Sequence, residues 1–243
     1  MIVMEYNKDN PLKVVTLCSG YDSQCLALER LKSVYPDFDY ELIAWSEFDP
    51  ESKTPLDKQP AVVAHNALFP QWSNRNLGDM TKIDWTQVDD FDLLFYSTPC
   101  QSVSQAGLQH GFTEGSGTRS SIIWNVRDAV KIKRPKFLCL ENVKAMVSGK
   151  FVGMFNLWQL ELERLGYRNF AEVLNAKDYG VPQNRERIFL VSIRDDGDLP
   201  RFFFPPAVPL ERRLKDVLED NVDEKYYLSD EMLERFQGNE QDK

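Results

Sequence analysis

The sequence predicts an α/β fold: a doubly wound, mostly parallel sheet with helices on both faces. Short runs of β-branched and aromatic residues alternate with segments whose leucines recur at helical spacing. Helices between strands imply crossover connections, and strands joined by crossovers are parallel. The last two predicted strands are joined by a segment without a helical pattern, so we expect the last strand to be antiparallel.

The first half of the chain predicts a strand, helix, strand unit followed by a second unit of the same kind. Residues 13–17 and 40–45 are predicted strands, and residues 23–34 between them form a predicted helix. A third strand is predicted at 91–96, followed by a polar loop and a helix at 121–131. Sheets of this kind bind ligands beyond the carboxyl ends of their strands.

The second half continues the pattern with a short, very apolar strand at 137–140. A helix is predicted at 151–165, ending at Gly166, where a left-handed cap residue is expected. Two further strands are predicted at 169–174 and 188–193.

The composition changes after the last predicted strand. Prolines and then charged residues replace the apolar runs, which indicates a linker and a short helical tail. We therefore predict a motif-bearing domain at residues 1–194 and a linker and tail at 195–243.

Composition and charge exclude several classes of protein. With 29 basic and 38 acidic residues the net charge is −9, so the chain as a whole has no electrostatic attraction to a phosphate backbone. Four cysteines without a C-x-x-C pair and only two histidines make a zinc site unexpected. The first residues do not form a signal peptide, and no apolar run approaches the ~20 residues of a membrane span. We expect a cytoplasmic protein with no bound metal and no membrane contact.

Cys100 lies in a polar loop directly after a predicted strand and follows Pro99. A nucleophile would be presented to a ligand at such a position. Taken alone, a single cysteine is more often a small buried hydrophobic residue. Glu141-Asn142-Val143 follows the next predicted strand, at the same edge of the sheet, and Gln183 to Arg187 opens the last strand.

Together these segments resemble a known family. Pro99-Cys100-Gln101, Glu141-Asn142-Val143 and Gln183-x-Arg185-x-Arg187 match, in order, motifs of the DNA cytosine-5 methyltransferases. The resemblance runs from about residue 14 to 194. It implies a Rossmann-like domain that transfers a methyl group from S-adenosylmethionine to C5 of a cytosine flipped out of duplex DNA. It also implies a bacterial or phage enzyme, as in restriction-modification.

The resemblance assigns catalytic roles to four residues. Cys100 attacks C6 of the ring and thereby makes C5 nucleophilic, and Glu141 protonates N3 as a carboxylic acid. Arg185 and Arg187 flank the target base and its phosphate, with Arg187 nearest the base. The ordinary alternatives are a solvated glutamate at a strand end and surface arginines that pair with neighbouring acids.

The loop and helix after Cys100 supply the expected DNA contacts. By resemblance these are Gln101, Ser104 and Arg119, the last in the segment Thr118 to Ser121 that starts a helix. The glycine-rich stretch 105–117 is predicted to be a lid that closes over the flipped base.

The cofactor turn departs from the family pattern. Where the family has Phe-x-Gly-x-Gly, this chain has Cys18-Ser19-Gly20-Tyr21-Asp22, which keeps one glycine and replaces the aromatic residue and the second glycine. We expect all five residues to contact S-adenosylmethionine, with Asp22 facing its ammonium group.

Further cofactor contacts are expected after the second strand and in the loop that follows. The resemblance places Glu47 on the ribose hydroxyls, Phe48 on adenine, and Asp79 with Met80 near the adenine amino group. Pro99 is expected beside the cofactor. The alternative is that the loop acids act as turn or cap residues.

The family's target-recognition region and final Gly-Asn motif are not visible in the sequence. The chain is therefore expected to be a truncated form, a subunit of a split enzyme or a degenerate homologue, and to need a recognition region or second subunit as partner. Two other functions remain open: a tRNA cytosine-5 methyltransferase, and a non-catalytic methyltransferase-like subunit.

Overall fold

The computed structural model describes residues 5–99, 113–115, 117, 119–197 and 202–238. The described part of the chain contains six strands and five α-helices, and most of them lie where the sequence predicts. They are β1 (Leu12–Leu17), α1 (Ser23–Val34), β2 (Tyr40–Ser46), α2 (Pro60–Leu68), β3 (Leu93–Tyr96), α3 (Val126–Lys133), β4 (Phe137–Val143), α4 (Val152–Arg164), β5 (Tyr167–Asn175), β6 (Glu186–Arg194) and α5 (Asp230–Gly238).

The strands form one six-stranded sheet in the order β2-β1-β3-β4-β6-β5. β1 pairs in parallel with β2 and β3, and β3 pairs in parallel with β4. β6 runs antiparallel to both of its neighbours, β4 and β5. The predicted fold class is confirmed, including the antiparallel last strand.

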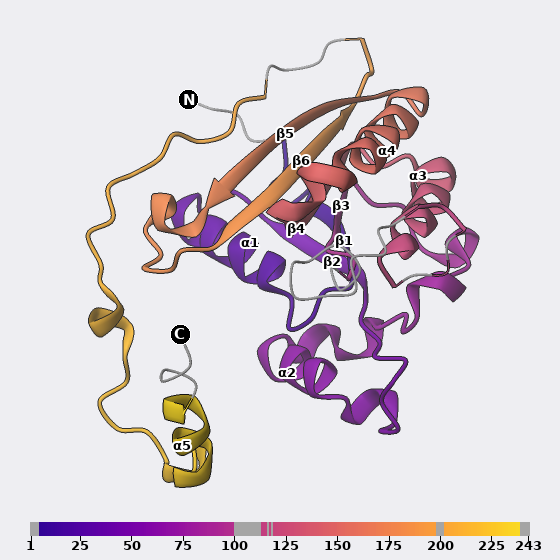
Figure 1. Cartoon of the computed structure of the whole chain (residues 1–243). Helices are drawn as coiled ribbons and strands as arrows, with labels where there is room; N and C mark the ends of the chain where they lie inside the picture. The colour runs from indigo at the N-terminus through magenta and orange to yellow at the C-terminus, as the bar shows by residue number, and fades with distance from the viewer. Residues whose placement is uncertain (1–4, 100–112, 116, 118, 198–201, 239–243) are drawn as a thin grey trace. The chain divides into compact units, whose positions relative to one another are not determined.

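Two hydrophobic cores lie on the two faces of the sheet, as the alternation along β1 requires. Val14 packs with α1 and α2 on one face, whereas Val15 and Leu17 pack with α3 and α4 on the other. Figure 1 shows α1 against one face of the sheet and α3 and α4 beyond the other. β2 and β3 flank β1 on opposite sides, so the order of the strands reverses beside β1. In such sheets ligands bind at this reversal point, beyond the carboxyl ends of the strands.

Three elements differ from the sequence prediction. Helix α2 was not predicted, although Pro60 stands at its first position, where proline is favoured. The predicted helix at 121–131 is a 3-10 helix, Arg119–Asn125, followed by α3. β4 extends to Val143, so Glu141 lies inside the strand instead of after it, because it pairs with Phe189 of β6.

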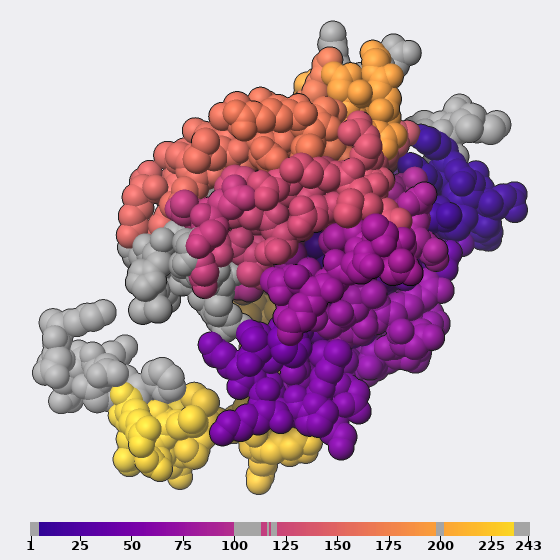
Figure 2. All heavy atoms as spheres, turned by 90° about the vertical axis from the view of Figure 1, so that its right-hand side faces the viewer, coloured from indigo at the N-terminus to yellow at the C-terminus, as the bar shows by residue number. Residues whose placement is uncertain are grey.

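The chain divides into two compact units. The first comprises residues 1–175 and 186–206, and the second comprises 176–185 and 207–243. In the first unit the 3-10 helix Trp85–Gln87 contacts α3. Figure 2 shows the purple and pink parts of the surface, to which these two segments belong, side by side. Every residue from 207 to 235 is exposed. Within the described residues, no helix is long and apolar enough to span a membrane.

Candidate active site

The turn after β1 has an unusual backbone. Cys18, Gly20 and Asp22 all have positive φ, at 52°, 59° and 64°. This conformation is easy for glycine and unfavourable for other residues. The turn directs the Gly20 N–H at Oε2 of Glu47, 2.6 Å away. The predicted cofactor turn and the predicted ribose-binding acid are therefore in direct contact.

Glu47 follows β2 and is largely enclosed. Burial raises the pKa of its carboxyl above the ordinary value, and the hydrogen bond from Gly20 partly opposes that rise. A ligand with hydroxyl groups would add hydrogen bonds to the ionised carboxylate and so stabilise it.

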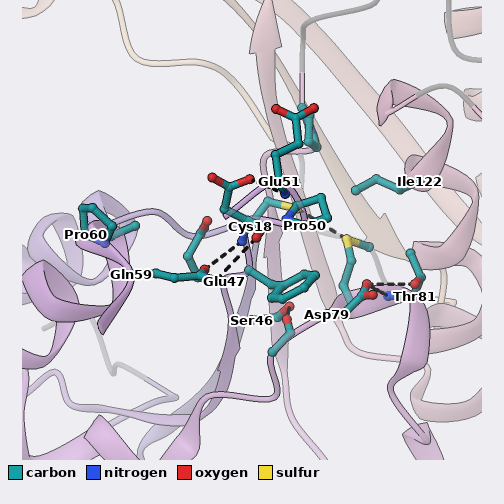
Figure 3. Close-up of a pocket in the computed structure, with 16 residues that line it drawn as sticks. Cys18, Ser46, Glu47, Pro50, Glu51, Gln59, Pro60, Asp79, Thr81 and Ile122 are labelled. Atoms are coloured by element: carbon teal, nitrogen blue, oxygen red, sulfur yellow. Dashed lines mark hydrogen bonds between the residues drawn. The ribbon is translucent and has the colours of Figure 1, made fainter. Parts of the chain in front are cut away.

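A cavity of about 610 Å³ opens beside this turn. Its volume suits a cofactor-sized molecule. Figure 3 shows the lining side chains gathered around it from several separate segments of the chain. Six of the predicted cofactor residues line the cavity, whereas Ser19, Gly20, Tyr21 and Asp22 do not. Those six are Cys18, Glu47, Phe48, Asp79, Met80 and Pro99.

Sequence reasoning missed the other residues of the wall. Three of them follow Phe48 directly in the chain, so a predicted cofactor segment longer by three residues would have included them. Others belong to the start of α2, for which the proline at the first helical position was the available signal. The missed residues are Ser46, Asp49, Pro50, Glu51, Gln59, Pro60, Ala61, Gly78, Thr81 and Ile122.

The wall of the cavity has one sign of charge. It carries the carboxylates of Glu47, Asp49, Glu51 and Asp79, and no lysine, arginine or histidine is among its described residues. Such a surface disfavours phosphate and favours a ligand with positive charge. S-adenosylmethionine has a sulfonium, an ammonium and no phosphate, so these residues fit it better than a nucleotide.

Asp79 lines the cavity and also acts as a cap. Its Oδ1 accepts hydrogen bonds from the Thr81 N–H at 3.0 Å and the Thr81 hydroxyl at 2.8 Å, and Lys82 Nζ lies 3.3 Å from Oδ2. Burial works to raise the pKa of this carboxyl, but the bonds from Thr81 and Lys82 outweigh it and lower the pKa. Asp79 thus acts as a cap residue, which was the alternative to a cofactor contact. Its contact with adenine remains a prediction.

Asp22 does not have the setting expected for an ammonium contact. Its side chain is fully buried, caps the start of α1 through the Cys25 N–H at 3.4 Å and accepts the Thr16 hydroxyl at 2.8 Å. The carboxylate thus faces groups of the protein itself, and Asp22 is not among the residues that line the cavity, so the expected ammonium contact stays a prediction. Tyr21, by contrast, is 53% exposed.

An ion pair lies at the carboxyl end of β4. Arg187 Nε is 3.0 Å from Glu141 Oε1, and both side chains are partly buried. Arg187 of β6 pairs with Val143 of β4, which is two residues beyond Glu141 and therefore on the same face of the sheet. The register of the two strands thus brings the side chains of Glu141 and Arg187 together. The side chain of Glu186, the residue before Arg187, pairs with Lys144 at 2.8 Å.

The loop after β3 is held against the end of β4. Asn142 Nδ2 donates a 2.9 Å hydrogen bond to the carbonyl oxygen of Thr98, and both residues are buried. Pro99, the next residue, lines the cavity. The predicted residues Cys100, Gln101 and Ser104 and most of the predicted lid lie outside the described residues.

Two further predicted residues are described only in part. Arg185 is exposed, and its carbonyl accepts the Ala176 N–H at 3.0 Å within the second compact unit. Arg119 begins the 3-10 helix Arg119–Asn125. Their contacts with nucleic acid remain predictions. Among the described residues no cluster of His, Cys, Asp or Glu could hold a metal ion.

Curated relatives of this chain include several proteins named as methyltransferases. The Type II methyltransferase M2.ScrFI of Lactococcus lactis is 44% identical over 66% of this chain and 44% of its own length. The orphan methyltransferase M.Rho11sI of Bacillus phage rho11s is 32% identical over 93% of this chain and 47% of its own length. The chain thus spans about half the length of these relatives.

Solved structures share the fold. A DNMT2 mutant of Spodoptera frugiperda has a TM-score of 0.67 at 18% identity, covering 93% of this chain and 65% of its own. A putative DNA modification methyltransferase from an Escherichia coli prophage has a TM-score of 0.63 at 22% identity, covering 87% and 56%. The family model described as C-5 cytosine-specific DNA methylase matches residues 12–243. The chain therefore belongs to the C-5 cytosine-specific DNA methylase family.

Proposed function

We propose that this chain provides the cofactor-binding and catalytic part of an enzyme that methylates C5 of cytosine in DNA through a covalent Cys100 adduct. One observation carries the proposal. The Asn142–Thr98 hydrogen bond joins the segment that leads into Cys100 to the strand end that bears the Glu141–Arg187 pair. A thiol, an acid and a guanidinium are the groups that addition to a cytosine ring requires.

The acidic cavity is the proposed site of S-adenosylmethionine, which supplies the methyl group. Glu47 would accept hydrogen bonds from the ribose hydroxyls, and Phe48, whose side chain is 36% exposed, would pack on the adenine. Pro99 lines the same cavity, so the cofactor site and the segment before Cys100 are continuous.

The chain's own residues would move protons and charge around the bound base. The Cys100 thiolate would add to C6 while the proton of Glu141 passes to N3, so that C5 gains the electron pair needed to take the methyl group, which leaves the cofactor's sulfur as a neutral thioether. Loss of the C5 proton to a base would then expel the Cys100 thiolate, and return of the N3 proton to Glu141 would restore the neutral ring. Arg187 would hold Glu141 and donate to the ring's carbonyl oxygen.

Methyl transfer to defined nucleic acids tests this proposal. The full-length gene product is incubated with S-adenosylmethionine labelled at its methyl group and with duplex DNA or tRNA. Label on C5 of cytosine in DNA, lost in Cys100→Ser, is the expected result. Label on tRNA alone would replace the DNA proposal with the tRNA alternative. Cofactor binding without transfer to either substrate would favour the non-catalytic alternative.

A further inference from the structure

Asp22 combines two unfavourable features. Its backbone is left-handed with φ of 64°, and its carboxylate has no exposed surface. A glycine would adopt this backbone freely, whereas aspartate adopts it at a free-energy cost. A buried carboxylate is also costly unless it is hydrogen-bonded and paired. The surrounding residues must therefore stabilise Asp22.

Three of the described residues surround the carboxylate. The Thr16 hydroxyl donates a hydrogen bond at 2.8 Å and the Cys25 N–H donates one at 3.4 Å, and the Cys25 thiol also lies beside the carboxylate. The third residue is His65, whose Nε2 lies 3.5 Å from Oδ2 of Asp22. Of these three side chains, only the imidazole can carry a positive charge.

His65 has no other polar contact to make. Its side chain is fully buried in α2, and neither ring nitrogen has a hydrogen-bond partner among the described residues. Its ring stacks on Trp45, with the centroids 3.6 Å apart and the planes 16° from parallel. Buried polar atoms without hydrogen-bond partners are rare in proteins. In His65, Nε2 lies beside the carboxylate of Asp22, and the ring packs against aromatic side chains of the core.

Both members of the pair lead directly to the cavity. Asp22 is two residues beyond Gly20, whose N–H bonds Glu47 at 2.6 Å. His65 belongs to α2, whose first residue, Pro60, lines the cavity wall. The pair therefore connects two separate walls of the cavity through the core beneath it.

We propose that the buried Asp22–His65 pair is a positioning device for cofactor binding: it holds the Gly20 turn in its left-handed path and fixes that turn to α2. This inference rests on the proposed function of the cavity. A rigid, preformed wall binds a ligand more tightly because less ordering is required on binding. His65 is thus a positioning residue that touches no ligand.

The test compares three variants of α2 in the full-length protein. His65→Leu keeps the approximate bulk and removes the imidazole, and His65→Gln restores an N–H donor. Val62→Ala is the matched control, because Val62 is buried in the same helix and its truncation weakens packing alone. We expect the dissociation constant for S-adenosylmethionine, measured by calorimetry, to rise about tenfold in His65→Leu. It should recover partly in His65→Gln and stay unchanged in folded Val62→Ala.

A double-mutant cycle isolates the pair. Asp22→Gly removes the carboxylate and places a glycine where the backbone is left-handed. In that background His65→Leu is expected to cause no further loss of affinity. Independent, additive losses from the two substitutions would overturn the proposal, as would equal affinities of His65→Leu and Val62→Ala.

Amide exchange in the ligand-free protein separates this inference from the proposed function. Residues 18–22 should exchange faster in His65→Leu than in Val62→Ala, because the turn is then less firmly held. A wild type that does not bind S-adenosylmethionine would contradict the proposed function. Unchanged exchange in His65→Leu would contradict the positioning role, whatever the affinity of the wild type.

Discussion

Glu141 and Arg187 act as a pair that the strand register sets. The 3.0 Å contact is diagonal across the ladder: Arg187 pairs with Val143, which is two residues beyond Glu141 and on the same face of the sheet. The side chain of Glu141 is 30% exposed, so it can meet a ligand as well as its partner.

Replacing Glu141 with glutamine is expected to lower kcat for methyl transfer by about 10² to 10⁴, because the amide cannot give up a proton to N3. The affinity for S-adenosylmethionine should not change. Lys144→Ala is the control, since it breaks the neighbouring exposed Lys144–Glu186 pair. Steady-state kinetics on DNA measures the effect, and near-normal turnover in Glu141→Gln would contradict the assigned role.

Glu47 predicts a pH dependence of cofactor binding. Burial raises its pKa in the free protein, and ribose hydroxyls would stabilise the ionised form and lower the pKa in the complex. Affinity should therefore rise as the pH increases through the raised pKa, with release of a proton on binding. Calorimetry in buffers of different ionisation enthalpy measures that proton. Glu47→Gln should bind more weakly and release none; a pH-independent wild type would argue against Glu47 as the ribose ligand.

Sequence reasoning located the site residues unevenly. The resemblance identified Glu47, Phe48 and Asp79, and all three line the cavity. It placed Asp22 towards the cofactor, whereas the carboxylate turns into the core to meet Thr16. A pattern in the sequence gives the position of a residue along a turn. The direction of its side chain depends on tertiary contacts that no local pattern encodes.

At the scale of elements, the strand ends do the positioning. β3 and β4 are parallel neighbours, so their carboxyl ends bring Thr98 and Asn142 together. Helix α1 has the bounds that the sequence predicts, but its leucines do not define its buried face: Cys25 and Leu28 are buried, whereas Leu26 is 40% exposed. Helix α2 carries little helical signal: its apolar residues are not confined to one face, and tertiary packing defines it.

Loss of the Asn142 side chain should loosen the loop before Cys100. Asn142→Ala leaves the buried carbonyl of Thr98 without its donor, which is expected to cost about 1–3 kcal/mol of unfolding free energy. Urea denaturation measures it. Asn156→Ala, in the exposed face of α4, is the control and should be nearly neutral. A neutral Asn142→Ala would mean that this hydrogen bond does not fix the loop.

At the scale of the whole molecule, the two compact units differ in how they are stabilised. The first contains both hydrophobic cores, whereas residues 207–235 of the second are all exposed. Several large apolar side chains are among those exposed residues, including Leu214, Leu218 and Tyr226. The stability of the fold is therefore expected to reside in the first unit.

A variant that ends at residue 206 tests this division. It loses the exposed segment and the Val208 N–H bond to the carbonyl of Asp178, but no part of either core. Its thermal midpoint should stay within about 2 °C of the longer chain, which corresponds to less than about 1 kcal/mol. Calorimetry provides the measurement, and a large drop would show that the second unit stabilises the first.

The central claim is the covalent role of Cys100, and trapping the adduct tests it most directly. With fluorine at C5 of the target cytosine, the final loss of the C5 substituent is blocked and the protein stays attached to DNA. The full-length gene product with S-adenosylmethionine and 5-fluorocytosine DNA should give a band stable to denaturation, and Cys100→Ser should give none. No adduct with the wild type, or an adduct that persists in Cys100→Ser, would contradict the account.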